Sequence, residues 1–196
     1  MPLSPVTLSG RHVDLLPLSP DHHDGLVEAV KDGSLWELWY TKVATPEAMA
    51  GEIERRLGLL AGGAMLPFTV FDKAAQRIVG MTTYLNVDLA VPRVEIGATW
   101  YARGAQRTPL NTEAKLLLLS HAFDALECRV VEFRTHVLNQ QSRRAIERLG
   151  ASLDGILRQH MRMPDGTIRD TCVYSIIAQE WPAVRSHLNW LLEKPR

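Results

Sequence analysis

The segment from Asn111 to Leu126 constrains the fold more than any other part of the chain. Its apolar residues cover most of a helical circumference instead of forming one stripe. Asn111 or Thr112 can cap the first turn, because either side chain can accept a hydrogen bond from a free backbone amide. A helix that is apolar on so many sides is expected to lie deep in the interior.

The stretch before this helix alternates with a period of two. From Arg93 to Ala102 the alternation predicts a strand with two distinct faces. One face carries Val94, Ile96, Ala98 and Trp100, and the other carries Glu95, Gly97, Thr99 and Tyr101. The chain therefore has a strand with one polar face directly before its most apolar helix.

Further strands and helices surround this unit. Strands are predicted at residues 11–18, 66–71, 78–87, 130–138, 152–163 and 167–177, and helices at 20–32, 45–61, 140–149 and from 182 onward. Thr45-Pro46-Glu47 is typical of a helix start. Pro164-Asp165-Gly166 predicts a tight turn, so the last two strands should form a hairpin. The order of elements indicates the α/β class.

The composition fits one soluble domain over residues 1–196. Lys plus Arg and Asp plus Glu both number 22, so no strong field favours nucleic acid or an anionic membrane as a partner. Cys128 and Cys172 have neither metal-ligand spacing nor the density of a disulfide scaffold, which favours the reducing cytoplasm. Neither a secretion signal nor a membrane-spanning segment is expected from the sequence.

Three segments carry a resemblance to a known family. Residues 94–101 (VEIGATWY), 111–115 (NTEAK) and 139–151 (NQQSRRAIERLGA) follow one another as a strand, a helix start and a short helix. The first two resemble the central strand and the start of the coenzyme-binding helix of the GNAT acetyltransferase superfamily, and the third is similar to its RimJ/RimL-like branch. With residues 158–160 and the turn at 164–166, the resemblance extends over nearly the whole chain.

The resemblance implies both a fold and a reaction. The implied fold is a central, mostly antiparallel, splayed sheet with helices on both faces. The implied reaction transfers an acetyl group from acetyl-CoA to a primary amine, of a small molecule or a protein N-terminus, by direct attack. Acetyl-CoA is then a co-substrate, and no metal is needed. The alternative is a non-catalytic acyl-CoA-binding or protein-interaction module with the same fold.

The resemblance also implies a coenzyme site. The family's diphosphate loop carries small residues where this chain has Pro109 and Asn111. Proline removes one amide donor, and we expect Arg103 and Arg107 to compensate with charge-assisted contacts. The residues that the resemblance assigns to the coenzyme are Ile96, Gly97, Ala98, Arg103, Gln106, Arg107, Thr108, Asn111, Thr112, Asn139, Ser142 and Arg143.

Three residues are candidates for proton transfer. An ammonium acceptor must lose a proton before it attacks, and His160 or Glu95 can accept it. His160 is the first choice because imidazole ordinarily titrates near neutrality. Ser142 resembles the hydroxyl that lies near the coenzyme sulfur and can protonate the departing thiolate. A structural histidine and a first-turn serine remain the alternatives for His160 and Ser142.

The acceptor pocket and the assembly state have weaker signals. The resemblance assigns the acceptor side to Trp36, Tyr40, Tyr84 and Asp170, although core packing also explains aromatic residues. His22 and His23 have no third ligand at a recognisable spacing, so no metal site is predicted. The apolar stripe of the last helix fits either a homodimer contact or packing within the chain.

Overall fold

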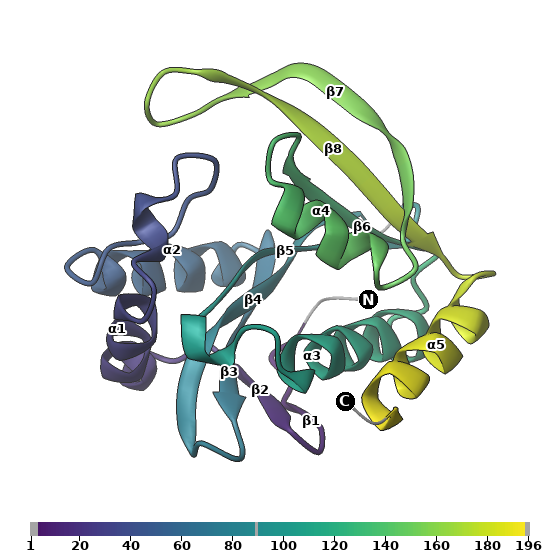
Figure 1. Ribbon diagram of the computed structural model, residues 1–196, viewed down its shortest axis with the longest axis horizontal. Coiled ribbons are helices and arrows are strands. Elements are labelled where there is room, and N and C mark those ends of the chain that lie inside the picture. The colour runs from purple at the N-terminus through teal and green to yellow at the C-terminus, as the bar shows by residue number, and fades with distance from the viewer. Residues whose placement is uncertain (1–3, 89, 195–196) are drawn as a thin grey trace.

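The computed structural model describes residues 4–88 and 90–194, and the strands in this part of the chain form one sheet in the order β1-β2-β3-β4-β5-β6-β8-β7 (Figure 1). They are β1 (Leu8–Ser9), β2 (Val13–Pro17), β3 (Met65–Asp72), β4 (Arg77–Asp88), β5 (Arg93–Tyr101), β6 (Val130–His136), β7 (Ser152–Arg162) and β8 (Ile168–Ile177). Neighbouring strands are antiparallel except β5 and β6, which are parallel. The predicted mostly antiparallel sheet is confirmed.

Helices cover both faces of this sheet, as predicted. They are α1 (His23–Lys31), α2 (Met49–Ala61), α3 (Pro109–Ser120), α4 (Gln140–Glu147) and α5 (Trp181–Glu193). Arg56 of α2 donates a hydrogen bond to Thr83 of β4, whereas Lys115 of α3 donates one to Thr82. Because successive strand residues point to opposite faces, α2 and α3 lie on opposite sides of β4. We call these sides the α2 face and the α3 face.

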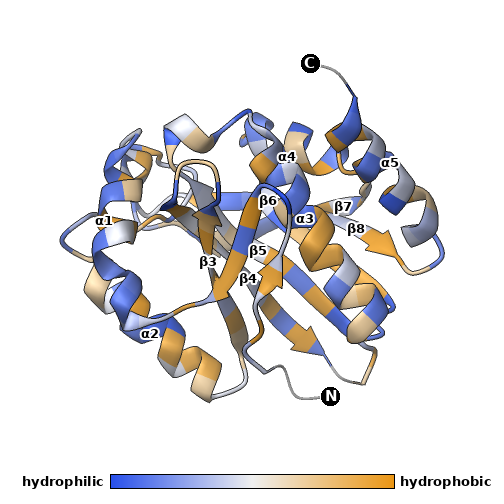
Figure 2. Cartoon of the chain, turned by 90° about the horizontal axis from the view of Figure 1, so that it is seen from below, coloured by the Kyte–Doolittle hydropathy of each residue, from blue (hydrophilic) through white to orange (hydrophobic). Residues whose placement is uncertain are grey.

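The core lies between the sheet and these helices. In Figure 2 the hydrophobic residues gather on the central strands and α3, whereas α4 is mostly hydrophilic. Ala114, Leu118 and Leu119 of α3 are fully buried, which confirms the predicted interior position of this helix. A wider π-type turn, His121–Ala125, extends α3 close to its predicted end.

Two helices begin at other residues than predicted. Thr108, not Asn111 or Thr112, caps α3, and its hydroxyl oxygen accepts from the Leu110 amide at 3.3 Å. Pro109 fits the first turn, because the amide that it lacks would have no partner within the helix there. The Thr45 hydroxyl oxygen accepts from the Ala48 amide at 3.3 Å, as its helix-start signal predicts, but residues 46–48 form a turn that leads into α2, which starts at Met49.

The last helix packs within the chain. Val184 and Leu188, which belong to the predicted apolar stripe of α5, are buried in the core, and α5 lies beside α3 (Figure 1). This half of the stripe is therefore covered without a partner subunit, whereas Leu191 and Leu192 are half-buried. The buried half does not argue for a homodimer.

The sheet opens between β5 and β6. Among the described residues, the two strands pair only from Arg93 to Glu95 and from Val130 to Glu132. Beyond this short ladder, β5 continues along β4 while β6 continues along β8. This divergence is the predicted splay, and it leaves the second half of β5 without a strand on its β6 side.

A β-bulge lies in β5 at this opening. Thr83 faces Gly97 and Met81 faces Trp100, so Ala98 and Thr99 share one position on β4. Ala98 adopts a left-handed backbone with φ of 47°. The bulge shifts the alternation by one residue, so Thr99 points to the α3 face. The predicted placement of Thr99 and Tyr101 on the face of Glu95, and of Trp100 on the opposite face, is therefore wrong.

Candidate active site

Glu95 lies at the base of the opening, because it is the last β5 residue paired with β6. The Asn86 side-chain amide donates to Glu95 Oε2 at 2.7 Å, and Arg134 Nε lies 3.5 Å from the same oxygen. A Cβ added to Gly97 would lie 2.9 Å from Glu95 Oε1. The missing side chain at Gly97 thus leaves room for Oε1 over the strand, next to the bulge.

Burial is the largest cause of a raised pKa at Glu95, whereas the hydrogen bond from Asn86 and the charge of Arg134 act in the opposite direction. The adjacent Glu132 carboxylate binds Arg93 Nη1 at 3.0 Å and Arg134 Nη2 at 2.9 Å. The opening therefore contains one carboxylate held by two guanidinium groups and one that is easier to protonate. A carboxylate of the second kind suits proton transfer near neutrality.

The partners of Glu95 could not be found from the sequence. Asn86 comes from β4 and Arg134 from β6, and only the strand register brings them to Glu95. Neither residue forms a motif with Glu95 along the chain. The sequence shows only that each is a polar residue in a predicted strand, which does not indicate a contact with Glu95.

His160 lies far from Glu95 in strand order, because β6 and β8 separate β7 from β5. Its side chain is exposed, and its Nδ1 lies 3.0 Å from Thr171 Oγ1. Thr171 Oγ1 also accepts from Arg169 Nε at 2.9 Å. His160 is therefore held on the β7–β8 hairpin, which β6 separates from the strand of Glu95.

The start of α4 lies at the end of β6. Asn139 caps this helix, and its side-chain oxygen accepts from the Ser142 amide at 3.0 Å. Ser142 is half-buried in the first turn. The structure thus joins two residues that the resemblance assigned to the coenzyme. The backbone amide of Ser142 has the role expected of a first-turn residue, because it donates to the helix cap.

The loop between β5 and α3 is hydrogen-bonded both to the end of β5 and to α4. Gln106 Nε2 donates to the Tyr101 carbonyl at 3.0 Å, and Gln106 Oε1 accepts from Gln141 of α4 at 3.3 Å. The loop continues through Arg107, whose backbone is left-handed with φ of 60°. These contacts bring the loop next to the first turn of α4.

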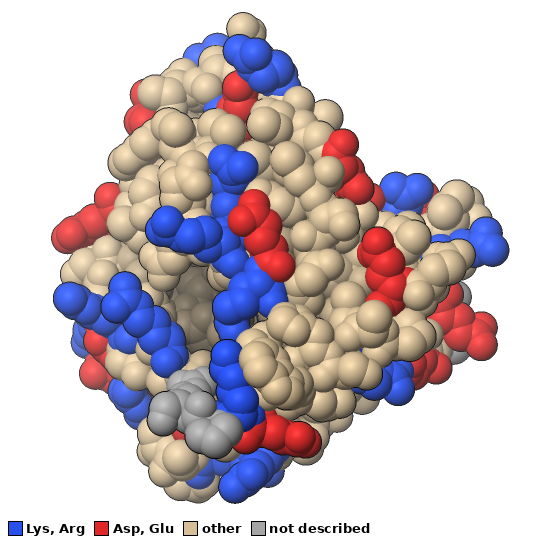
Figure 3. Space-filling model, turned by 45° about the vertical axis from the view of Figure 1, so that its right-hand side comes forward, with Lys and Arg blue, Asp and Glu red and all other residues tan. Residues whose placement is uncertain are grey.

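Basic side chains gather around this loop and α4. Figure 3 shows a hollow on the side of the molecule that carries α3, α4 and α5, with Lys and Arg side chains on both sides of it. The loop contributes the exposed Arg103 and Arg107, and α4 with the residue after it contributes the exposed Arg144 and Arg148. Such a rim can attract a phosphate group.

Three expected coenzyme residues point elsewhere. Thr112 is buried and accepts from Arg148 Nη2 at 3.1 Å. Arg143 donates from Nε to the Tyr174 hydroxyl at 3.0 Å and is thereby directed toward β8. The Ile96 side chain is buried in the core, so only its backbone borders the opening. Asn111 is half-buried in the first turn of α3, and Gly97 and Ala98 lie at the bulge.

The acceptor candidates from the Trp36–Tyr40 region lie near the open end of β6. Trp39 packs edge-on against Tyr40 at 5.6 Å and against His136 at 5.2 Å between ring centroids. Trp36 is half-buried against the core. The sequence did not suggest His136, whose Nδ1 accepts from the Leu138 amide at 3.0 Å and whose pKa is lowered mainly by burial.

Tyr84 and Asp170 have other positions than expected. Tyr84 is fully buried on the α3 face, where its hydroxyl donates to the Leu118 carbonyl at 2.6 Å, so the structure corrects its assignment to the acceptor pocket. Asp170 accepts from the Gln159 amide at 2.8 Å and pairs with Arg158 at 2.7 Å. These bonds hold the irregular part of the β7–β8 hairpin and leave Asp170 at its surface.

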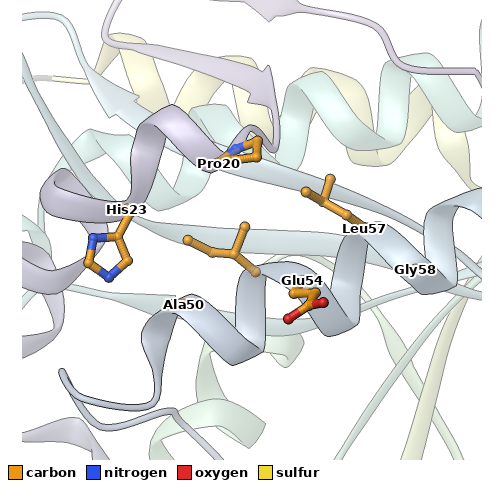
Figure 4. Close-up of a pocket in the computed structure, with 7 residues that line it drawn as sticks. Pro20, His23, Ala50, Glu54, Leu57 and Gly58 are labelled. Atoms are coloured by element: carbon orange, nitrogen blue, oxygen red, sulfur yellow. The ribbon is translucent and has the colours of Figure 1, made fainter.

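A separate cavity of about 430 Å³ lies between the start of α1 and α2 (Figure 4). Its walls are mostly apolar and are formed by Pro20, His23, Ala50, Ile53, Glu54, Leu57 and Gly58. None of these residues was assigned to the coenzyme or the acceptor.

Among residues 4–88 and 90–194, no helix is long and apolar enough to cross a membrane.

Comparison with known proteins bears on the chemistry of the opening. A family model described as an acetyltransferase (GNAT) domain matches residues 12–152. YdaF of Bacillus subtilis (strain 168), named as a candidate ribosomal N-acetyltransferase, is 31% identical over 104 residues, which are 53% of this chain and 56% of YdaF. The match therefore spans only a little over half of that curated relative.

Solved structures share the fold over most of their length. A GCN5-related N-acetyltransferase from Brucella melitensis superposes with a TM-score of 0.84 at 33% identity, covering 97% of this chain and 87% of the other. The Salmonella typhimurium acetyltransferase that modifies the N-terminal serine of ribosomal protein L7/L12 superposes with a TM-score of 0.77 over 88% of this chain and 99% of its own. Its identity of 17% makes this a likeness of fold.

Proposed function

The chain belongs to the GNAT acetyltransferase family, in agreement with the RimJ/RimL-like resemblance, and from this premise we propose that it is an N-acetyltransferase. It transfers an acetyl group from acetyl-CoA to a primary amine by direct attack, and residues 1–196 act as one domain. The opening between β5 and β6 with Glu95 at its base carries this proposal. The family match does not favour a non-catalytic module.

The residues around the opening fit an acyl-CoA substrate. Acetyl-CoA supplies the acetyl group as a thioester. The backbone of Gly97 and Ala98 has no strand on the β6 side, so it can hold an extended pantetheine arm. Arg103, Arg107 and Arg144 are the candidate contacts of the phosphates, while Pro109 removes one amide from the helix start. Asn139 and Ser142 border the arm from the α4 side.

Glu95 is the general base in this proposal, in place of His160. Oε2 is held by Asn86, so Oε1 is the oxygen that takes the proton of the amine, directly or through water. The raised pKa of Glu95 brings its proton affinity closer to that of a useful base at neutral pH. Ser142 is the candidate donor to the departing thiolate.

The acceptor side is assigned to the α2 face near the open end of β6. Tyr40, Trp36 and Asp170 are its candidate contacts, and Trp39 with His136 adds an aromatic wall. The name of YdaF makes a ribosomal-protein amine one candidate acceptor, beside small amines. The buried free thiols Cys128 and Cys172 support a cytoplasmic location. A homodimer is still a hypothesis without a specific surface.

The test compares Glu95→Gln with His160→Ala. Acetyl-CoA-dependent thiol release is measured with a panel of primary amines and peptides with free N-termini, and CoA binding is measured by calorimetry. Glu95→Gln should lower kcat by about 10²-fold or more with CoA affinity unchanged. Because the pKa of Glu95 is raised, the wild-type rate should begin to fall on acidification at a pH that is still above the usual range of carboxyl groups. This acidic limb of the pH–rate profile should be absent in Glu95→Gln.

His160→Ala should retain the wild-type rate, and the exposed Glu54→Gln serves as a carboxylate control. Wild-type protein that binds CoA but releases no thiol would favour the acyl-CoA-binding module, and protein that does neither would favour the protein-interaction module. Equal rates in wild type and Glu95→Gln would instead remove Glu95 as the base while leaving the reaction in place.

A further inference from the structure

Lys115 is a buried cation that has no acidic partner among the described residues. It lies on α3, its side chain is 6% exposed, and its Nζ donates to Thr99 Oγ1 at 3.0 Å and to Thr82 Oγ1 at 3.3 Å. The two hydroxyl groups also bond each other at 2.8 Å. Lys115, Thr82 and Thr99 thus form a closed polar cluster, which we call the threonine clamp.

The threonine clamp depends on the β5 bulge. If β5 alternated regularly from Gly97 through Ala98, Thr99 would point to the α2 face, away from Lys115. Thr82 is the single β4 residue opposite the bulge, and Thr99 is one of the two residues facing it. Lys115 therefore binds one hydroxyl from each of the two strands that meet at the bulge. The two hydrogen bonds can form together only when β5 has the bulged register.

The position of Lys115 is unfavourable for stability alone. Burial lowers the pKa of Lys115 to about 7, and no charge on a neighbouring group contributes to the shift. The buried titratable groups of β4, β5 and α3 besides Lys115 are Tyr84, Tyr101, Glu113 and Glu95, and Glu95 lies on the opposite, α2 face of the sheet. The Glu113 carboxylate is occupied by the Arg11, His12 and Val13 amides. An apolar side chain would fill the same site without the desolvation of an ammonium group.

We propose that Lys115 is a positioning residue, which through the threonine clamp fixes the β5 bulge and with it the backbone along which acyl-CoA extends. The inference rests on the proposed function, because it gives the bulge a role in placing the thioester. Lys115 touches neither substrate, and it acts through Thr99 on the Gly97–Ala98 backbone. Thr99 Oγ1 also donates to the Gly97 carbonyl oxygen at 3.4 Å. The clamp thereby reaches Gly97, the residue that leaves room for Glu95 Oε1.

The test uses Lys115→Met together with the pair Thr99→Val and Thr99→Ser. Thr99→Ser keeps the hydroxyl, whereas Thr99→Val removes it at nearly the same volume. Lys115→Met and Thr99→Val should lower kcat at saturating acetyl-CoA roughly tenfold or more, because a displacement of about 1 Å at reacting atoms can reduce the rate on the order of 10²-fold. Thr99→Ser should keep the wild-type rate. Lys31→Met, an exposed lysine on α1, is the control and should behave as wild type.

A structural readout separates this inference from the proposed function. Hydrogen exchange of the Gly97–Thr99 amides, measured without substrate, should be faster in Lys115→Met and Thr99→Val than in wild type and Thr99→Ser. Unchanged exchange in both variants, or unchanged kcat, would overturn the role of Lys115. Wild-type protein that does not bind CoA in calorimetry would overturn the proposed function, while the exchange rates would still decide whether the clamp holds the bulge.

Discussion

Two buried cations reach β4 from opposite sides, and their surroundings differ. On the α2 face, Arg56 donates to Thr83 Oγ1 at 2.7 Å and to the Glu52 carboxylate at 2.6 Å. On the α3 face, Lys115 reaches the neighbouring residue, Thr82, and its partners among the described residues are hydroxyl groups alone. Burial is the largest cause of a lowered pKa for both cations, and the Glu52 carboxylate opposes it only for Arg56.

The difference separates a structural cation from a positioning one. Arg56 completes an ion pair that joins α2 to the sheet, and its charge is balanced locally. Lys115 has no such balance, yet it lies where β5 changes register beside the opening. A buried group that destabilises the fold is easier to understand where it controls the geometry of a site.

Replacing Arg56 should have the largest effect on stability. Arg56→Met removes the charge that pairs with the half-buried Glu52, and breaking a buried ion pair on one side usually costs several kcal/mol. Arg55 still binds Glu52 at 2.8 Å, so we expect a loss of roughly 3 kcal/mol at pH 7, toward the low end of that range. Urea denaturation measures this loss. A variant as stable as wild type would contradict the view of Arg56 as a structural cation.

Replacing Lys115 should have the opposite sign and depend on pH. The pKa of Lys115 falls from 10.5 when unfolded to about 7 when folded, so the unfolded chain binds more protons between these values and wild-type stability rises with pH there. Below pH 7 the full desolvation penalty is present. Lys115→Met, which lacks this penalty, should be more stable than wild type by roughly 2 kcal/mol at pH 6.

The gain in Lys115→Met should shrink toward zero by pH 10, because the lysine is then neutral in the folded state and the ammonium group no longer has to be desolvated. The Thr82 and Thr99 hydroxyl groups still bond each other, so the variant leaves neither without a partner. Unfolding free energies at pH 6 and pH 10 test this trend. A loss of stability at pH 6 would contradict it, whereas Lys31→Met should show no such dependence on pH.

The two faces of β4 also show how far the sequence can be read. Alternation correctly assigned Glu95 and Gly97 to one face, and the apolar pattern of α3 correctly predicted a buried helix. Alternation failed from Thr99 to Tyr101, because a bulge adds one residue without a signal in the side-chain pattern. Helix starts shifted because Thr108 caps α3 one residue before a proline that the first turn tolerates.

The candidate site was less predictable than the fold. Glu95 was identified because it is a carboxylate on a polar strand face, but its partners Asn86 and Arg134 come from other strands. Arg143 was assigned to the coenzyme by its place in a motif, and only the structure shows that it binds Tyr174. Contacts of this kind follow from strand register and helix orientation, which local patterns do not contain.

The smallest expected effects sharpen the comparison most directly, because Thr83→Val and Thr82→Val each remove one hydroxyl partner at nearly constant volume. Arg56 keeps Glu52 in Thr83→Val, so a loss of about 1 kcal/mol with little change between pH 6 and pH 9 is expected. Lys115 keeps only Thr99 in Thr82→Val. Fewer groups then stabilise the ammonium form, which lowers the pKa of Lys115 further and makes the loss larger at pH 6 than at pH 9. Equal losses at both pH values in Thr82→Val would mean that Lys115 is not charged in the clamp at pH 6, and the contrast between the two faces would then rest on geometry alone.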